Sequence, residues 1–517
     1  MKKTEFGAPA ATETCSETSS VNDKEINKTT FENPKQFYAA FFSLSALALA
    51  AAFSSTSLSV SLATIAQHFS LSTPKTFWLA TSTALTSTVI QPCCATLADV
   101  LGRKKSLTIS AAALAIGSLI GALAQNYATI ISGRSIQGIG AGGVYAISDI
   151  IITDIVPLRH RGKWFAFISI SAAIGTTMGP ILSGVLTKEG SWRWIFAINV
   201  IMTVIAILAC LWALPSTTRG RDRLSKLRKV DFIGFTILSV SLVALLVPLM
   251  QATVVFPWKD ARTLVPLLIG FLGIMVFLIF EQKFAKSPLI PLADFNNRTC
   301  LLTFFCTLLH GLVLWCLMYY LPVYYEFVKG YDMLRSGLAI LPETSTLVFS
   351  SALIGVLVSW SGRYRWAIWL GWAVSAMGVG ILYLLDQSTP VSQWIGLNLA
   401  AGIGMGILFG ALGFAIQASV EPERVPIAIT MFSFFRSFGA ALGIAIGSAM
   451  VSSETENSQE MLPMDLDSRM AALRKIWIFC TAVCALAFVA SLGIQSFSLE
   501  KPLNTSEEQD KEANAIV

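Results

Sequence analysis

The hydrophobic pattern of this chain is a series of long apolar runs separated by short polar segments. Such runs have about the length that an α-helix needs to cross a bilayer, which is about 20 residues. The pattern predicts an all-α membrane protein with fourteen spanning helices, at residues 38–66, 77–98, 106–125, 128–152, 164–187, 192–214, 232–251, 263–282, 301–327, 336–360, 365–386, 393–419, 426–450 and 476–498.

The polar segments divide the chain into five parts. We expect a disordered tail, a six-helix bundle, a basic loop with two inserted helices and a following loop, a second six-helix bundle and a second tail, at 1–36, 37–214, 215–300, 301–498 and 499–517.

A weak internal repeat supports this plan. Leu, Gly and Arg recur after a shift of 260 residues, at Leu97, Gly102 and Arg103 and again at Leu357, Gly362 and Arg363. Repeated halves are typical of transporters. The shift pairs the first six helices with the last six.

Composition excludes most soluble functions. Charged residues make up 13% of the chain, against about 25% in ordinary soluble domains. The net charge is +6, but the bases lie in short loops and form no stripe, so we expect no nucleic-acid partner. The nine cysteines lie mostly in apolar runs and suggest neither a disulfide framework nor a metal site.

Loop charges predict the orientation. The loops after even-numbered helices carry the larger share of Lys and Arg, which places them in the cytosol. Both tails then lie in the cytosol, and the sequons at Asn27, Asn297 and Asn504 also fall on that side. We expect a multi-pass protein of the plasma membrane, with the vacuolar membrane as the alternative.

Energy sources are restricted by what the sequence lacks. No P-loop pattern is present, and the glycine run at 138–143 lacks the preceding strand of a dinucleotide site. We therefore expect no enzyme activity and no cofactor, and an ion gradient remains as the energy source.

Three motifs carry a resemblance to a known family. Residues 97–105 resemble the signature loop of the major facilitator superfamily, residues 134–142 its second motif, and residues 175–184 the motif associated with antiporters. The chain looks like a fungal member of the fourteen-helix drug:proton antiporter branch. The resemblance covers about residues 40–500. It implies two six-helix bundles plus two inserted helices, acting as an efflux pump for toxins and drugs.

The first motif implies a gate. Asp99 and Arg103 are four residues apart and can pair with each other or with a helix end, and Arg103 can also pair with Asp154 across the bundle. Contacts that hold one conformation and break in another suit a switch. The alternative is a charge cluster that only sets orientation. The gating residues would be Asp99, Gly102, Arg103, Lys104 and Asp154.

Embedded charges give candidates for coupling. Arg134 lies inside a predicted helix, where a central Arg costs about 2.5 to 3.5 kcal/mol on insertion scales, so it should face the interior or an acidic partner. Asp149 lies about 60° from it around the helix at about 100° per residue, so the two share a face. A purely structural ion pair is the alternative. The expected coupling and cavity residues are Arg134, Gln137, Asp149, His310, Tyr324, Glu343 and Arg436.

The third motif predicts a bent helix. Pro180 removes a backbone hydrogen bond within the spanning helix at 164–187. Small residues beside it let a neighbouring helix approach. The expected bend residues are Gly175, Gly179, Pro180 and Gly184.

One departure from the family's pattern affects which residue can bind the proton. The family's first helix usually carries an Asp where this chain has Ser54, and a Pro where it has Ala63. A proton cannot exchange at Ser54, so coupling must use Asp149, Arg134 or another group.

We interpret the chain as a secondary active exporter of amphipathic toxins, drugs or secondary metabolites, driven by protons and acting as a monomer. Two alternatives stay open. One is transport of amino acids or siderophores at the vacuolar or plasma membrane. The other is a non-transporting sensor, which the short inter-helix segments disfavour.

Overall fold

The computed structural model describes residues 34–189, 191–215, 231–251, 256–285, 288–290, 297–456 and 466–499. Within these ranges the chain is helical and contains no β-strand. Fourteen of its helices are long and apolar enough to cross a membrane, so the predicted fold class is confirmed. The predicted tails, with Asn27 and Asn504, lie almost wholly outside the described residues.

The first half of the chain forms helices that pack on one another. Helix α6 contacts α4 and α5, while α2 contacts α7 and α8. The helices are α2 (Pro34–Thr56), α3 (Leu58–His68), α4 (Thr73–Leu101), α5 (Arg103–Ala122), α6 (Tyr127–Ile155), α7 (Arg161–Glu189) and α8 (Arg193–Ala213).

The last part of the chain forms a second set. Helix α16 contacts α14 and α15, while α12 contacts α17 and α18. These helices are α12 (Arg298–Phe327), α13 (Met333–Ala339), α14 (Leu341–Ser361), α15 (Arg365–Ile381), α16 (Val391–Ser419), α17 (Val425–Glu456) and α18 (Leu466–Ser491).

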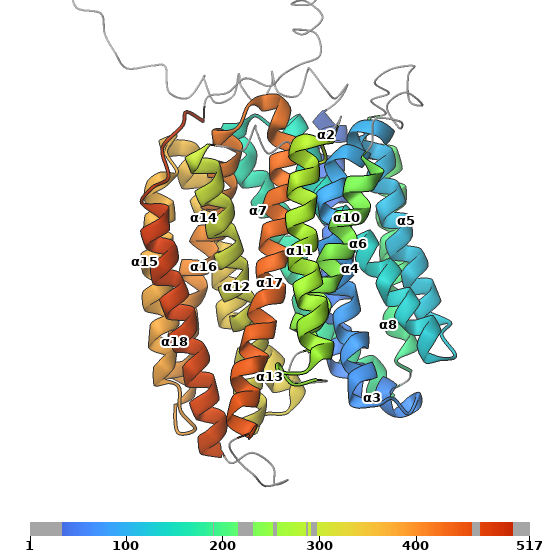
Figure 1. The fold of residues 1–517 in the computed structure, drawn as a ribbon, viewed down its shortest axis with the longest axis vertical. Coiled ribbons are helices and arrows are strands. Elements are labelled where there is room, and N and C mark those ends of the chain that lie inside the picture. The colour runs from blue at the N-terminus through green and yellow to red at the C-terminus, as the bar shows by residue number, and fades with distance from the viewer. Residues whose placement is uncertain are drawn as a thin grey trace, which may run out of the picture.

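The two sets meet along a seam. Here α7 packs on α14, and α17 packs on α4 and α6. Helices α10 (Phe232–Gln251) and α11 (Ala261–Lys283) pack on each other, and α10 also contacts α4 and α17. Figure 1 shows α15 and α18 at one edge of the molecule, α5 and α8 at the other, and α10 and α11 between them.

Rows of exposed apolar side chains mark the outward faces. Ile205 and Leu208 on α8, and Leu268 and Leu272 on α11, are each more than half exposed. In water such rows would be costly, but lipid chains solvate them as well as a protein core does. They support a bilayer as the solvent of these helices.

Two predicted helices are interrupted in the structure. The helix expected at 38–66 breaks at Ser57, between α2 and α3. Just before the break, the carbonyl of Ser54 accepts a hydrogen bond from Arg134 (2.9 Å), and Thr56 bonds across to the carbonyl of Thr176 (3.0 Å). The second helix, expected at 336–360, breaks at Ile340, two residues before Pro342, because proline has no N–H to continue the helical hydrogen bonds of α13.

The last helix was misplaced by the apolar pattern. It was expected at 476–498, but α18 runs from Leu466 to Ser491. The first turns were missed because they contain bases. Their charged ends lie against polar or aromatic groups: Arg469 donates to the carbonyl of Phe327 (3.1 Å), and Arg474 lies over the ring of Tyr383. Long basic side chains of this kind let a helix continue past its apolar part.

The repeated loops both place a glycine at positive φ. Gly102 between α4 and α5 has φ +89°, and Gly362 between α14 and α15 has φ +65°. Side chains with a Cβ rarely adopt this region, which explains glycine at both positions. The match supports a structural repeat with the 260-residue shift.

Candidate gating and coupling site

The predicted gate residues do meet. Arg103 at the start of α5 pairs with Asp99 at the end of α4, and its Nε donates to Asp154 near the end of α6 (2.8 Å). Both carboxylates are partly exposed. Exposed ion pairs are worth at most about 1 kcal/mol each, so this cluster can break during a conformational change.

Lys104 and Gly102 hold the loop between α4 and α5 in place against the end of α8. The Nζ of Lys104 donates to the carbonyls of Leu211 and Leu214 at the end of α8, each at 2.7 Å. A cation at a helix C-terminus satisfies carbonyls that lack helical partners. Together with the left-handed Gly102, it fixes the α4–α5 loop against the first set of helices.

A second contact at this end crosses the seam, and the sequence did not reveal it. Arg161 at the start of α7 is buried and donates to Gln417 of α16 (2.6 Å), as well as to the carbonyls of Thr153 and Val156. Beside it the backbones of Gly162 and Gly355 lie so close that a Cβ on Gly162 would sit 2.6 Å from the Gly355 oxygen. The α7–α14 contact therefore requires glycine.

Arg134 organises a buried network within the first set of helices. Its Nη1 donates to the carbonyl of Ser54 (2.9 Å) and to the amide oxygen of Gln137 (3.1 Å). Gln137 donates to Ser118 (2.8 Å), which also accepts from Asn199 (3.0 Å). The network joins α2, α5, α6 and α8. Arg134 is buried and contacts no acid within the described residues, so of the expected surroundings it has the bundle interior and not an acidic partner.

Asp149 instead faces the other set of helices. Its carboxylate accepts a hydrogen bond from Ser433 of α17 (3.0 Å) and interacts electrostatically with Arg436, one turn further along α17. Both Asp149 and Arg436 keep partial exposure although they lie on helices at the seam. The pair thus links α6 to α17 through charge.

Aromatic rings surround Arg436. The guanidinium carbon lies 4.3 Å from the ring centre of Phe409 and 5.0 Å from that of Phe432. Phe409 in turn lies edge-on to His310 of α12, whose Nε2 is 3.1 Å from the carbonyl oxygen of Met405. Cation–π contacts stabilise a charge out of water, and here they hold Arg436 near Asp149.

Two of the expected cavity residues lie elsewhere. Tyr324 is buried and donates to the carbonyl of Asp386, in the segment after α15 (2.8 Å). Glu343, in the first turn of α14, is fully buried, and neither carboxyl oxygen has a hydrogen-bond partner in the described structure. The expected group of seven residues is therefore three separate sites, around Arg134, around Arg436 and at the ends of α12 and α14.

The antiporter-like segment packs on α2. A Cβ on Gly175 would lie 2.3 Å from the carbonyl oxygen of Leu49, and one on Gly179 equally close to the hydroxyl of Thr56. Helix α7 continues through Pro180, past the partly buried Gly184, to Glu189. The close approach predicted for the small residues is present. The bend at Pro180 stays a prediction.

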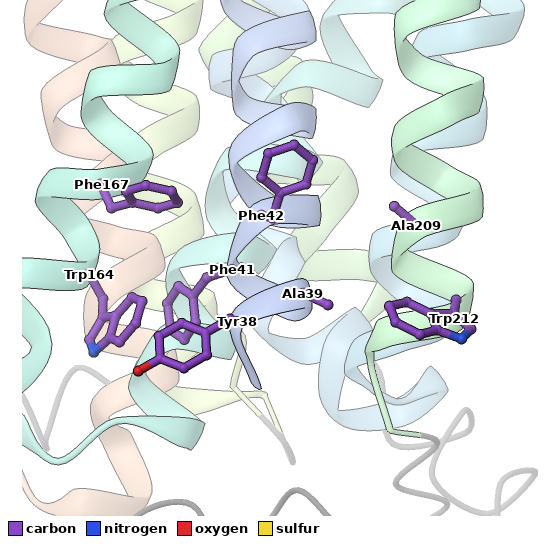
Figure 2. Close-up of a pocket in the computed structure, with 8 residues that line it drawn as sticks. All are labelled: Tyr38, Ala39, Phe41, Phe42, Trp164, Phe167, Ala209 and Trp212. Carbon is purple, nitrogen blue, oxygen red and sulfur yellow. The ribbon is translucent and has the colours of Figure 1, made fainter. Parts of the chain in front are cut away.

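An apolar groove of about 610 Å³ opens on the outward side of the first helices. Its walls come from α2, α7 and α8, and Figure 2 shows the rings of Tyr38, Trp164 and Trp212 at one level near the helix ends. Aromatic belts of this kind are typical of the membrane–water interface. The groove has almost no polar lining, and a specific ligand site normally needs a few polar groups. It therefore suits lipid chains better than a transported substrate.

Comparison with known proteins decides the family. The family model described as "Major Facilitator Superfamily" matches residues 44–444. The chain belongs to the major facilitator superfamily. Members of this superfamily are transporters, so the chain is a membrane transporter and not an enzyme, as its sequence predicted.

Similar superfamily members come from fungi. The chain is 36% identical over 505 residues to "MFS transporter L2" from a Phoma species, covering 92% of this chain and 84% of that protein. It is 32% identical to "MFS-type efflux pump MMF1" from Pseudozyma antarctica, covering 78% and 74%. It is also 29% identical to the "Acurin A biosynthesis cluster MFS-type transporter" from Aspergillus aculeatus, covering 91% of each.

Solved structures of the superfamily share the fold. The proton:xylose symporter XylE aligns with a TM-score of 0.62 at 14% identity, covering 92% of this chain and 99% of that one. The human organic anion transporter MFSD10 aligns with a TM-score of 0.58, also at 14% identity, covering 89% and 100%. At this identity the likeness concerns the fold alone.

Proposed function

We propose that this transporter exports amphipathic toxins, drugs or secondary metabolites from the cytosol in exchange for protons. The names of its relatives support export, since they include an efflux pump and a transporter of a biosynthesis cluster. The lack of a P-loop pattern in the sequence favours an ion gradient over ATP as the energy source.

The observation that carries the proposal is the charge pair across the seam. Asp149 on α6 accepts a hydrogen bond from Ser433 on α17 and interacts electrostatically with Arg436 on the same helix, across the contact between the two sets. Charges that are largely removed from water are costly unless hydrogen bonds or opposite charges lie near them. Moving the two sets apart therefore changes the free energy of both groups, and a substrate that enters between them changes it as well. Such differential contacts are what alternating access requires.

The orientation and membrane follow from the loop charges. We propose that the α4–α5 loop, with Arg103 and Lys104, faces the cytosol together with both tails. Contacts such as Arg161–Gln417 then form a cytosolic gate. The protein would act as a monomer in the plasma membrane.

A cell assay tests export. Expressed in a drug-sensitive yeast, the protein should lower the intracellular level of at least one of three amphipathic compounds: ethidium (a cation), cycloheximide (neutral) and mycophenolic acid (an anion). Asp149→Asn, which removes the charge but keeps the shape, should abolish that effect at equal surface expression. The proposal fails if none of the three levels falls, or if one rises.

The matched control is Ser132→Ala. Ser132 lies on the same helix as Asp149, is exposed, and bonds only to a carbonyl of its own helix. Its loss should leave export unchanged. Export lost in both variants would point to disturbance of α6 in general and not to the charge of Asp149.

A further inference from the structure

Glu343 is an acid without a partner in a place where acids are costly. It lies in the first turn of α14, its exposed fraction is 0%, and neither carboxyl oxygen has a hydrogen bond from the residues that the structure describes. An ionised carboxylate held this way would suffer its full desolvation cost, which far exceeds that of the neutral acid. In the arrangement described here, Glu343 therefore carries a proton.

Among the side chains that the structure describes, none near Glu343 is a cation that could change this; the side chain of Lys188 on α7 lies outside the described residues. Helix α16, which packs on α14, has no ionisable residue along its length. Tyr325 of α12 interacts electrostatically with Glu343, and its hydroxyl accepts a hydrogen bond from Asn398. On α13, Arg335 pairs with Asp332 at the surface (3.6 Å). The bases of α7 whose side chains the structure describes, Arg161 and Lys163, flank Gly162, which contacts Gly355, twelve residues along α14 from Glu343.

A second buried acid in the same chain provides the contrast. Glu281 of α11 is also buried, but both of its oxygens accept a hydrogen bond from the backbone N–H of Leu289, at 2.9 and 3.1 Å. A donor in this position favours the ionised form. Burial alone therefore does not distinguish Glu343 in this chain; burial with no donor does.

The helix that carries Glu343 lies at the moving seam. Helix α14 packs on α7 of the first set and on α16 of the second. It is separated from α13 by a break at Ile340, with Pro342 just before Glu343. The groups beside Glu343 are Tyr325 of α12 and Gly402 of α16, so a change in the α7–α14 contact reaches the carboxyl by moving α14 against these two helices.

We propose that Glu343 is the proton-binding group of the transport cycle. This rests on the proposed antiport. A proton from outside binds to a carboxylate oxygen of Glu343 and is held there while the halves meet as described. When α7 and α14 part, water reaches the carboxyl, the proton leaves to the cytosol, and the negative charge remains until the next proton arrives. The position fills the role that Ser54 cannot perform.

The first test reads the bound proton directly. Dicyclohexylcarbodiimide modifies protonated carboxyls in apolar surroundings, and mass spectrometry locates the adduct. On the purified full chain near neutral pH, we expect more adduct at Glu343 than at Glu281, and loss of the Glu343 adduct as the pH rises further. No adduct at Glu343, or equal labelling of Glu281, would overturn the inference.

The second test separates proton coupling from the movement of substrate through the protein. In proteoliposomes, Glu343→Gln should lower pH-gradient-driven accumulation of the panel compounds by about tenfold or more, in the usual range of coupling free energies, while counterflow without a gradient continues. Glu343→Asp should restore part of the gradient effect. Asp149→Asn should lose counterflow as well, because it breaks the charge pair at the seam.

The outcomes distinguish this inference from the function on which it rests. If wild-type protein uses the gradient and Glu343→Gln does so equally, antiport stands and Glu343 is not its proton site. If wild-type protein shows no gradient-driven transport of ethidium, cycloheximide or mycophenolic acid, the proposed antiport fails, and the carrier role of Glu343 fails with it. If Glu343→Gln loses counterflow too, its role is structural, which also contradicts the inference.

Discussion

At the scale of single residues, the least replaceable side chain is Arg134. It is almost fully buried, and its guanidinium satisfies the Ser54 carbonyl at the point where α2 ends. The sequence predicted that Arg134 faces the interior, because a lipid-facing Arg would be too costly. It could not predict the partner, since that partner is a backbone carbonyl 80 residues away.

We expect Arg134→Ala to destabilise the protein. Hydrogen bonds to charged groups contribute about 1.5 to 3 kcal/mol each, and the substitution leaves Ser54 and Gln137 without their donor. Thermal unfolding of the purified protein should show a clear fall in midpoint, with a smaller one for Gln137→Ala. An unchanged midpoint for Arg134→Ala would mean that the network does not hold α2 in place.

At the scale of elements, the apolar runs predicted each spanning helix but not its interruptions. Run length reports only where the chain is apolar. The break at Ser57 depends on what the backbone meets, which is Arg134 and Thr176, and the break at Ile340 depends on Pro342, which the length of the apolar run does not register. The start of α18 was missed for the opposite reason: Arg469 and Arg474 made a helical segment look polar.

The contact between α7 and α16 gives a prediction at this scale. Arg161→Ala removes the donor to three oxygens, those of Gln417, Thr153 and Val156. Gln417→Ala removes only one of these contacts. We expect both variants to lower the unfolding midpoint, Arg161→Ala more strongly, with a coupling between them of about 1 kcal/mol or more.

A double-mutant cycle checks this contact. If the effects of Arg161→Ala and Gln417→Ala simply add, the two side chains do not interact in the native protein. The close glycine pair, Gly162 and Gly355, would then be the main contact at this end of the seam.

At the scale of the whole molecule, the fold could be predicted because every spanning helix must be mostly apolar over about 20 residues. The candidate site could be predicted only in part. Local pairs such as Asp99 with Arg103 follow from spacing. The link from Asp149 to Ser433 joins residues 284 apart and depends on which helices meet at the seam, which one sequence does not state. One sequence likewise does not show that Glu343 has no hydrogen-bond donor among the described residues.

The even number of spans predicts that both tails lie on one side. Epitope tags on the N- and C-termini should both be inaccessible to antibody on intact yeast cells and both become accessible after permeabilisation. A tag in the short segment between α15 and α16 should react on intact cells. A tail tag that reacts without permeabilisation would contradict the proposed orientation.

Proton antiport requires that substrate and protons move in opposite directions. Proteoliposomes loaded with a pH-sensitive dye, with equal pH on both sides, receive external ethidium, cycloheximide or mycophenolic acid. Because either orientation of an antiporter gives the same sign, inward movement of a transported compound should make the lumen more alkaline. Protein-free liposomes and Glu343→Gln should show no such change. Acidification of the lumen would indicate symport, and an unchanged pH during uptake would indicate uncoupled transport; either result would contradict the account.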